Sequence, residues 1–132
     1  YPQKVDGYFN IGVLHTSLNG REGHDNYAPC TINDLVNKYY DYWALGHIHK
    51  KEIVKETNPR IIYSGNIQGR HSKESEEKGC FLVQIDENHR ITPIFKKLNK
   101  VEFLDIKVDI VKALLVSSPK YILYWLASYV PE

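Results

Sequence analysis

The stretch Tyr42–Lys50, which reads YWALGHIHK, constrains the fold more than any other part of the sequence. It begins as a short apolar run without helical spacing and reaches a glycine, Gly46, which is typical of a strand buried on both faces. A glycine there lets the backbone bend sharply or be approached closely by a ligand. We therefore expect a buried strand with functional residues at its carboxyl end.

Two histidines, His47 and His49, follow this glycine with one residue between them. In extended backbone, alternate side chains point to the same side, so both imidazoles would face one small volume. Neutral imidazole is the commonest metal ligand in proteins, whereas a single histidine in such a place is more often a structural residue. The pair predicts a metal site at the end of the strand.

A second apolar run delivers a histidine in the same way. Residues 9–14 read as a strand with the odd-numbered apolar residues on one face, and His15 stands directly at its end. In α/β sheets, ligands bind beyond the carboxyl ends of the strands. His15 therefore joins the other two histidines as a candidate metal ligand.

Between these two strands the sequence predicts one clear helix, over about 31–40. Thr31 suits the N-cap position, and Asp34 three residues later completes a capping box. Apolar residues at helical spacing then predict an amphipathic helix of two to three turns that packs on a sheet; they are Ile32, Leu35, Val36 and Tyr39. A strand–helix–strand unit favours parallel strands.

Beyond His49, strand patterns follow in close succession, which is typical of antiparallel hairpins. The expected strands are 50–55, 60–63, 80–85 and 91–98, with 101–110 as a further candidate. The charged segment 72–78 is expected to be a solvated hairpin or flap. The apolar tail, 111–132, is treated apart from the domain over 1–110, and its apolar run is too short to span a bilayer.

Two polar loops hold side chains that suit a phosphate group. The loop 19–29 contains Arg21 and His24, and an ordinary solvated loop is its alternative interpretation. The loop 64–71 contains two glycines and Arg70, so backbone N–H groups and a basic side chain can approach an anion there. It is not a P-loop, because no Lys-Ser/Thr pair and helix follow the glycines.

Composition limits the partners and the compartment. Lys and Arg number 17 against 16 Asp and Glu, and the resulting net charge of +1 does not indicate a polyanionic partner. Cys30 and Cys80 lie far apart without CxxC spacing, so we expect plain thiols in a reducing, cytoplasmic compartment. The sequence contains no methionine, even at position 1, and we therefore expect it to be a piece of a longer protein.

The strand ends that carry histidines resemble the last two metal-binding motifs of the calcineurin-like metallophosphoesterases. The likeness extends to the bacterial DNA repair exonuclease branch of YhaO type, which is related to the SbcD and Mre11 nucleases. It rests on the segments 11–18, 20–30, 41–50, and 65–71 with 78–80. Altogether the resemblance covers about residues 8–100.

This resemblance implies an α/β fold: the carboxyl-terminal portion of a four-layer αββα metallophosphoesterase sandwich, mostly strands. It implies two divalent metal ions, usually manganese, with His15 and His47 binding one ion and His49 the other. Imidazole also suits iron or zinc. The side chains expected to meet substrate are Arg21, His24, Lys50, Asn66, Arg70 and His71.

The family's earlier motifs, Asp-x-His, Gly-Asp and Gly-Asn-His, have no match in this chain, so we expect no catalytic acid/base residue within it. We expect a portion of a DNA exonuclease that acts in DNA repair and is inactive as an isolated fragment. The whole protein would bind DNA and a Rad50-like or SMC-like ATPase, and no membrane. The alternatives are a small-molecule phosphodiesterase or phosphatase of the same superfamily, and a non-catalytic interaction module with structural histidines.

Overall fold

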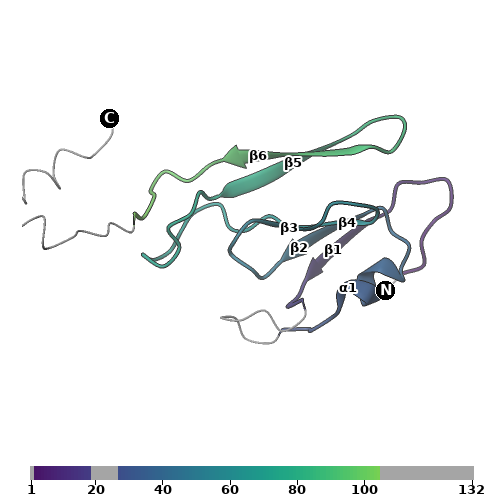
Figure 1. Ribbon diagram of the computed structural model, residues 1–132, viewed down its shortest axis with the longest axis horizontal. Helices are drawn as coiled ribbons and strands as arrows, with labels where there is room; N and C mark the ends of the chain where they lie inside the picture. Colours follow the sequence, from purple (N-terminus) through teal and green to yellow (C-terminus); the bar gives the residue numbers. More distant parts are fainter. Residues whose placement is uncertain (1, 19–26, 105–132) are drawn as a thin grey trace, which may run out of the picture.

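The computed structural model describes residues 2–18 and 27–104. This part of the chain contains one helix and six strands in two sheets (Figure 1). The elements are β1 (Ile11–His15), α1 (Ile32–Val36), β2 (Tyr42–Gly46), β3 (Glu52–Lys55), β4 (Arg60–Tyr63), β5 (Gly79–Ile85) and β6 (Ile91–Lys97). None of the helices in these two ranges is long and apolar enough to cross a membrane.

The larger sheet has the strand order β1-β2-β4-β3. β1, β2 and β4 are parallel, and β3 pairs antiparallel with β4. The predicted parallel pairing of the first two strands and the hairpin after His49 are therefore confirmed. β2 lies inside the sheet, and its residues Tyr42, Trp43 and Leu45 are buried, as its apolar sequence predicts.

Trp43 determines how β1 packs against β2. The parallel register sets Gly12 opposite Trp43, and a Cβ atom on Gly12 would lie 2.2 Å from the indole ring. The other face of β1 carries the predicted apolar residues, but Ile11 and Val13 are 52% and 80% exposed. The core therefore lies on the glycine side of β1, because the indole fills the space that a side chain would need.

The predicted capping box at the start of α1 is confirmed. The Thr31 hydroxyl accepts from the Asp34 backbone N–H at 3.1 Å, and the Asp34 carboxylate accepts from the Thr31 N–H at 2.8 Å. The predicted length is wrong, because α1 ends at Val36 rather than near residue 40. Tyr39 adopts a positive φ of 59° and is exposed, whereas Tyr40 turns into the core and stacks on Trp43.

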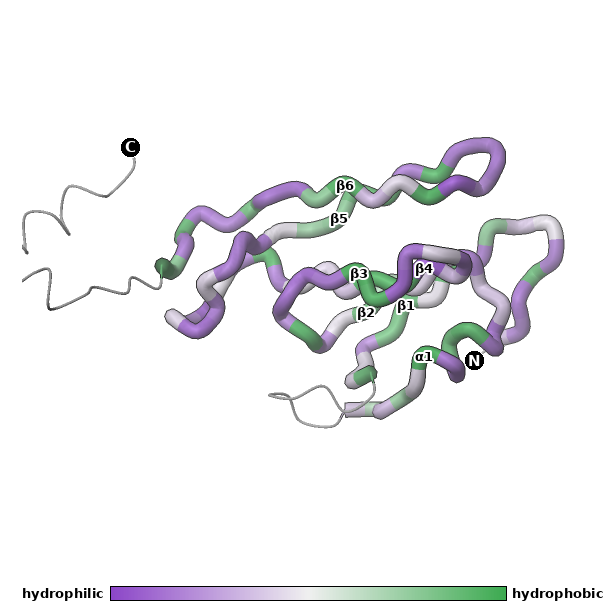
Figure 2. The backbone as a smooth tube through the Cα atoms, viewed as in Figure 1, coloured by the Kyte–Doolittle hydropathy of each residue, from purple (hydrophilic) through white to green (hydrophobic). Residues whose placement is uncertain are grey.

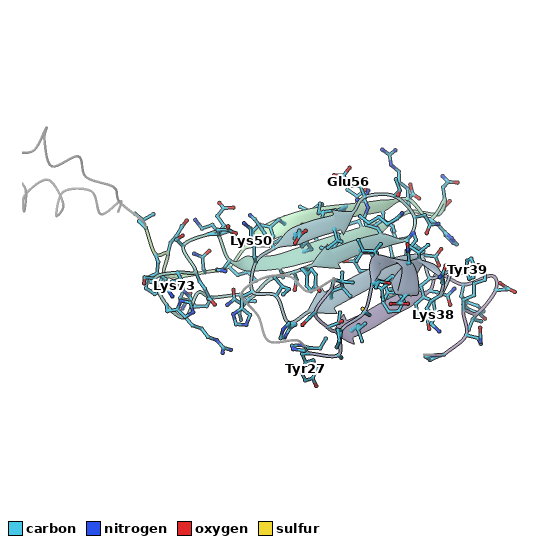
Figure 3. The ribbon with its side chains drawn as sticks, turned by 60° about the horizontal axis from the view of Figure 1, so that its bottom comes forward. Tyr27, Lys38, Tyr39, Lys50, Glu56 and Lys73 are labelled. Atoms are coloured by element: carbon cyan, nitrogen blue, oxygen red, sulfur yellow. The ribbon has the colours of Figure 1, made fainter. Side chains whose placement is uncertain are left out.

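The sheet lies between α1 on one side and the β5–β6 hairpin on the other (Figure 1), and Figure 3 shows the same arrangement after a turn. The hairpin runs antiparallel from Gly79 opposite Lys97 to Ile85 opposite Ile91. Lys51, directly before β3, reaches the hairpin with its Nζ 3.7 Å above the Phe95 ring centroid. Hydrophobic residues gather in the strands and hydrophilic residues in the loops (Figure 2).

The fold also tests the predictions for the two cysteines and for the end of the domain. Cys30 and Cys80 are free thiols, as predicted. Residues 101–104, the first part of the candidate strand 101–110, are not a strand, so this prediction can hold only for its second half, 105–110. That half, the tail 111–132, Arg21 and His24 all lie outside the described residues.

The core predicts that two isoleucines of the β3–β4 hairpin contribute very differently to the free energy of unfolding. Ile61 is fully buried and Ile53 is 40% exposed. Ile61→Ala is expected to lower the free energy of unfolding by about 2–5 kcal/mol, because it leaves a cavity beside Trp43 and Leu45. Ile53→Ala, the matched control, is expected to cost less than about 1 kcal/mol. Urea denaturation measures both, and equal losses would contradict this assignment of the core.

Candidate functional site

The candidate site lies where the parallel strands end. Because β1, β2 and β4 run in one direction, the segments that follow them meet at one edge of the sheet. Lys50 and Lys73 mark the loops at this carboxyl edge in Figure 3, whereas Lys38 and Tyr39 lie at the other end. The predicted histidines His15, His47 and His49 all belong to the carboxyl edge.

The register between β1 and β2 brings two of these histidines together. His15 pairs with Gly46, so its ring lies beside the next residue of that strand, His47. His15 Nε2 and His47 Nδ1 are 3.2 Å apart. A Cβ atom at Gly46 would lie 3.2 Å from His15 Nδ1, which is a tight contact. The glycine therefore leaves room for the His15 ring.

The spacing of the two nitrogens fits one metal ion. Nitrogen ligands at about 2.1 Å from a single ion are about 3.0–3.4 Å apart when their angle lies between about 90° and 110°. Within 2–18 and 27–104, including this site, no three histidine, cysteine, aspartate or glutamate side chains cluster closely enough to hold an ion. His15 and His47 therefore supply two ligands of a site, not a complete set.

The backbone bends at His47 and not at the glycine before it. His47 has a φ of 99°, whereas Gly46 is not among the glycines with positive φ. Such backbone strain in a non-glycine residue costs about 1–3 kcal/mol and is concentrated at functional sites. The sequence reasoning assumed extended backbone through His47 and His49, and that assumption is wrong.

The segment that follows His15 is buried and tied to two neighbours. Thr16 and Ser17 are almost fully buried. The Tyr63 hydroxyl donates to the Thr16 carbonyl at 2.9 Å and accepts from the Leu18 N–H at 3.2 Å. Ser17 and Tyr27 exchange two bonds, from Ser17 N–H to the Tyr27 carbonyl and from Tyr27 N–H to Ser17 Oγ. These bonds hold the end of β1 against β4 and bring Tyr27 to the site.

Tyr27 contacts both rings of the histidine pair. Its ring meets His15 edge-on, with centroids 5.2 Å apart, and stacks on His47 at 5.9 Å. Tyr27 appears at the lower edge of the molecule in Figure 3. The sequence reasoning missed this residue, because nothing in a polar loop marks one tyrosine among ten as a neighbour of the histidines.

His49 takes a different partner, Glu74. His49 Nδ1 lies 2.7 Å from Glu74 Oε1. The other carboxylate oxygen accepts from Asn66 Nδ2 at 3.0 Å and from the Arg70 backbone N–H at 2.9 Å. His71 Nε2 lies 3.7 Å from Glu74 Oε1. The loop 64–71 thus binds an anion, as its composition predicts, but that anion is a carboxylate of the chain itself.

Competing effects act on the pKa of Glu74. Burial raises it, but hydrogen bonds from His49, Asn66 and the Arg70 backbone outweigh that effect and lower the pKa from 4.5 to about 2. The carboxylate is therefore ionised at neutral pH. Since an ionised carboxylate can only accept, these three groups are its donors.

The segment 72–78 is not the uniformly solvated flap that its charge predicts. The Glu74 side chain is 10% exposed, and Lys78 is 5% exposed with Nζ donating to the His49 carbonyl at 2.9 Å. The run KESEEK does not distinguish these inward residues from their solvated neighbours. The sequence therefore held no signal that could have identified Glu74.

The remaining predicted site residues lie around the same loops. Lys50 is exposed and pairs with Glu76 at 2.8 Å, and this hydrogen bond raises the pKa of Lys50. The Arg70 side chain and His71 are exposed at the surface. Whether these residues bind substrate stays a prediction.

A groove of about 400 Å³ lies at the opposite, amino-terminal edge of the sheet. Its lining includes Asp41, directly before β2, Arg60, the first residue of β4, and Arg90 from the β5–β6 turn. Ligands of parallel sheets bind at the carboxyl edge. We therefore place the candidate site at the histidines and not in this groove.

Known proteins include a relative of this chain. No protein-family model matches the chain. The chain is similar to a protein of Bacillus subtilis (strain 168) described as uncharacterized metallophosphoesterase YhaO, with 44% identity over 113 residues. The alignment covers 86% of this chain and 28% of the length of that relative. The chain is thus homologous to one portion of a metallophosphoesterase, which confirms the predicted relationship at this level.

The environment of Glu74 predicts how stability depends on pH. A folded-state pKa near 2, below the ordinary 4.5, stabilises the fold above about pH 4.5, and this stabilisation is lost as the pH falls toward 2. Between about pH 2 and pH 4.5, Glu74 takes up a proton when the protein unfolds. Glu74→Gln is therefore expected to lower the number of protons taken up on unfolding by as much as one in this pH range. Urea denaturation at a series of pH values measures it.

Glu87→Gln is the matched control for that experiment, because Glu87 is exposed in the β5–β6 turn. This variant is expected to keep the pH dependence of the unmodified protein. The same pH dependence in both variants would show that Glu74 does not carry it.

Proposed function

We propose, with the homology to the Bacillus metallophosphoesterase as the premise, that this chain is part of a metal-dependent DNA exonuclease that acts in DNA repair. The observation that supports a metal-dependent phosphoesterase best is the pair of nitrogens 3.2 Å apart at the carboxyl edge. In this proposal, residues outside this chain supply the remaining ligands and the acid/base group. The chain alone is then expected to be inactive.

The histidines divide between two ions in this proposal. His15 and His47 hold one ion, and His49, which lies in the same loop as His47 but contacts Glu74, belongs to the other. Divalent ions, manganese by the family resemblance, supply Lewis-acid activation of the phosphate and of water when bound. Tyr27 restricts rotation of the His15 and His47 rings by packing on both.

Basic side chains at the same edge provide the contacts to phosphate. Lys50 and Lys73 lie on the loops of this edge (Figure 3). Arg70, which lies between them in the sequence, is exposed. An arginine can bind a phosphate with two parallel hydrogen bonds, whereas a lysine acts as a point charge. These groups would orient a phosphodiester toward the histidines, and Arg21 and His24 would join them.

DNA as the substrate rests on the likeness of the four sequence segments to the exonuclease branch. The same likeness supports a Rad50-like or SMC-like ATPase as partner. A second candidate is a small phosphodiester or phosphomonoester, which the balanced charge of +1 favours over a polyanion. An interaction module without metal is a third candidate, in which the 3.2 Å spacing is a hydrogen bond between the His15 and His47 imidazoles.

A substrate comparison separates the first two candidates. The full-length protein is expected to degrade linear DNA in the presence of manganese at least about 10-fold faster, per phosphodiester bond, than it cleaves a chromogenic nitrophenyl diester, because extended DNA meets all the basic groups of the edge. Gel and absorbance assays measure the two rates. Hydrolysis of the small ester alone would contradict the exonuclease proposal while preserving the enzyme class.

Substitution of one paired histidine tests the metal site. His15→Ala in the full-length protein is expected to weaken manganese binding at least about 10-fold and hydrolysis about 100-fold, because one ion loses a ligand. Titration calorimetry and the hydrolysis assay measure the two effects.

The matched control removes a histidine far from the site. His89 lies in the β5–β6 turn with a φ of 61°, which asparagine tolerates, so His89→Asn is expected to bind and hydrolyse normally. Unchanged manganese binding in His15→Ala would exclude His15 as a ligand.

A further inference from the structure

We propose that Glu74 is a positioning residue that fixes the tautomer and the orientation of His49, so that its Nε2 atom is presented for metal coordination. The inference rests on the proposed function, because it assigns the metal-ligating atom of one of its histidines. The segments that resemble the exonuclease branch do not contain Glu74.

Two hydrogen bonds determine the state of Glu74. Its Oε2 accepts from Asn66 Nδ2 at 3.0 Å and from the Arg70 N–H at 2.9 Å, and these groups can only donate. A carboxylate that accepts two such bonds is held in its ionised form. Its other oxygen, 2.7 Å from His49 Nδ1, is therefore an acceptor as well. A neutral His49 must then carry its proton on Nδ1 and its lone pair on Nε2.

The backbone of His49 is held as firmly as its ring. Its carbonyl accepts from Lys78 Nζ at 2.9 Å and from the Asn66 N–H at 3.3 Å. Gly65 makes this approach possible, because it has a φ of 73° and a Cβ atom there would lie 2.9 Å from the His49 oxygen. Since both the carbonyl and Nδ1 are bound, the direction of Nε2 is determined by the loops around it.

Burial separates Glu74 from the other acids of its segment. The Glu74 side chain is 10% exposed, whereas those of Glu76 and Glu77 are 45% and 50% exposed and pair with Lys50 and Lys51. A buried carboxylate is retained only where its hydrogen bonds compensate for desolvation. The geometry therefore assigns the orienting role to one of three neighbouring glutamates.

A carboxylate behind a ligating histidine has a known general effect. It fixes the ring, selects the tautomer and makes the ligating nitrogen more basic, and its removal weakens metal binding about 10–100-fold. Glutamine at position 74 cannot reproduce the pattern. If its oxygen accepts from Asn66 and Arg70, its NH2 group faces His49 Nδ1, which must then accept and leave the proton on Nε2.

The test measures the tautomer directly. Full-length protein with 13C,15N-labelled histidine is prepared without metal, as the unmodified sequence, Glu74→Gln and Glu77→Gln. The His49 resonances are expected to report Nδ1–H in the unmodified protein and in Glu77→Gln, and a shift toward Nε2–H in Glu74→Gln. Manganese affinity, measured by calorimetry, is expected to fall about 10–100-fold in Glu74→Gln alone.

Each result has a distinct meaning. Nε2–H at His49 in the unmodified protein would overturn the inference without reference to any variant, so a folding defect in Glu74→Gln cannot mask failure. An unchanged tautomer and affinity in a folded Glu74→Gln would also overturn it. If the unmodified protein shows Nδ1–H and binds no manganese, the orientation by Glu74 is supported and the proposed function fails.

Discussion

The site depends on the parallel register between β1 and β2. Because this register sets His15 opposite Gly46, the residue that follows Gly46 must lie beside the His15 ring. A shift of one residue along the strand would turn His15 to the other face of the sheet. Trp43 enforces the register, since its indole fits only opposite a residue without a side chain, and Gly12 is that residue. Packing in the core thus determines the distance between two imidazole nitrogens at the surface.

A second constraint, electrostatic rather than steric, organises the loops beyond the sheet. Glu74 collects donors from two stretches of chain that have little regular structure: the loop after β2 and the loop 64–71. Hydrogen bonds to an ionised group are stronger than neutral ones, so this carboxylate can order segments that the core does not cover. The two constraints meet at residues 47–49, where the bend at His47 sends the two histidines toward different partners.

Regular elements could be predicted because their signals are local. The alternation and apolar runs located every strand of the described residues to within two residues, and Thr31 with Asp34 located the start of α1. The end of α1 was missed because the chain has to turn there to enter β2, a requirement that lies in the sheet and not in the helical spacing. The inward turn of Glu74 and Lys78 was missed for a similar reason, since their partners lie far along the chain or on other loops.

By itself, the sequence determined that histidines follow two apolar strands, that a polar loop can bind an anion and that the chain resembles part of a metallophosphoesterase. These properties follow from residue type, order and spacing, which need no knowledge of distant contacts. The family resemblance already grouped His15 with His47. Only the tertiary structure decided that Tyr27 covers both rings and that the anion in the loop is Glu74. The physical reason is that hydrogen bonds and ring contacts depend on which segments the sheet register and the core bring within a few ångströms of one another.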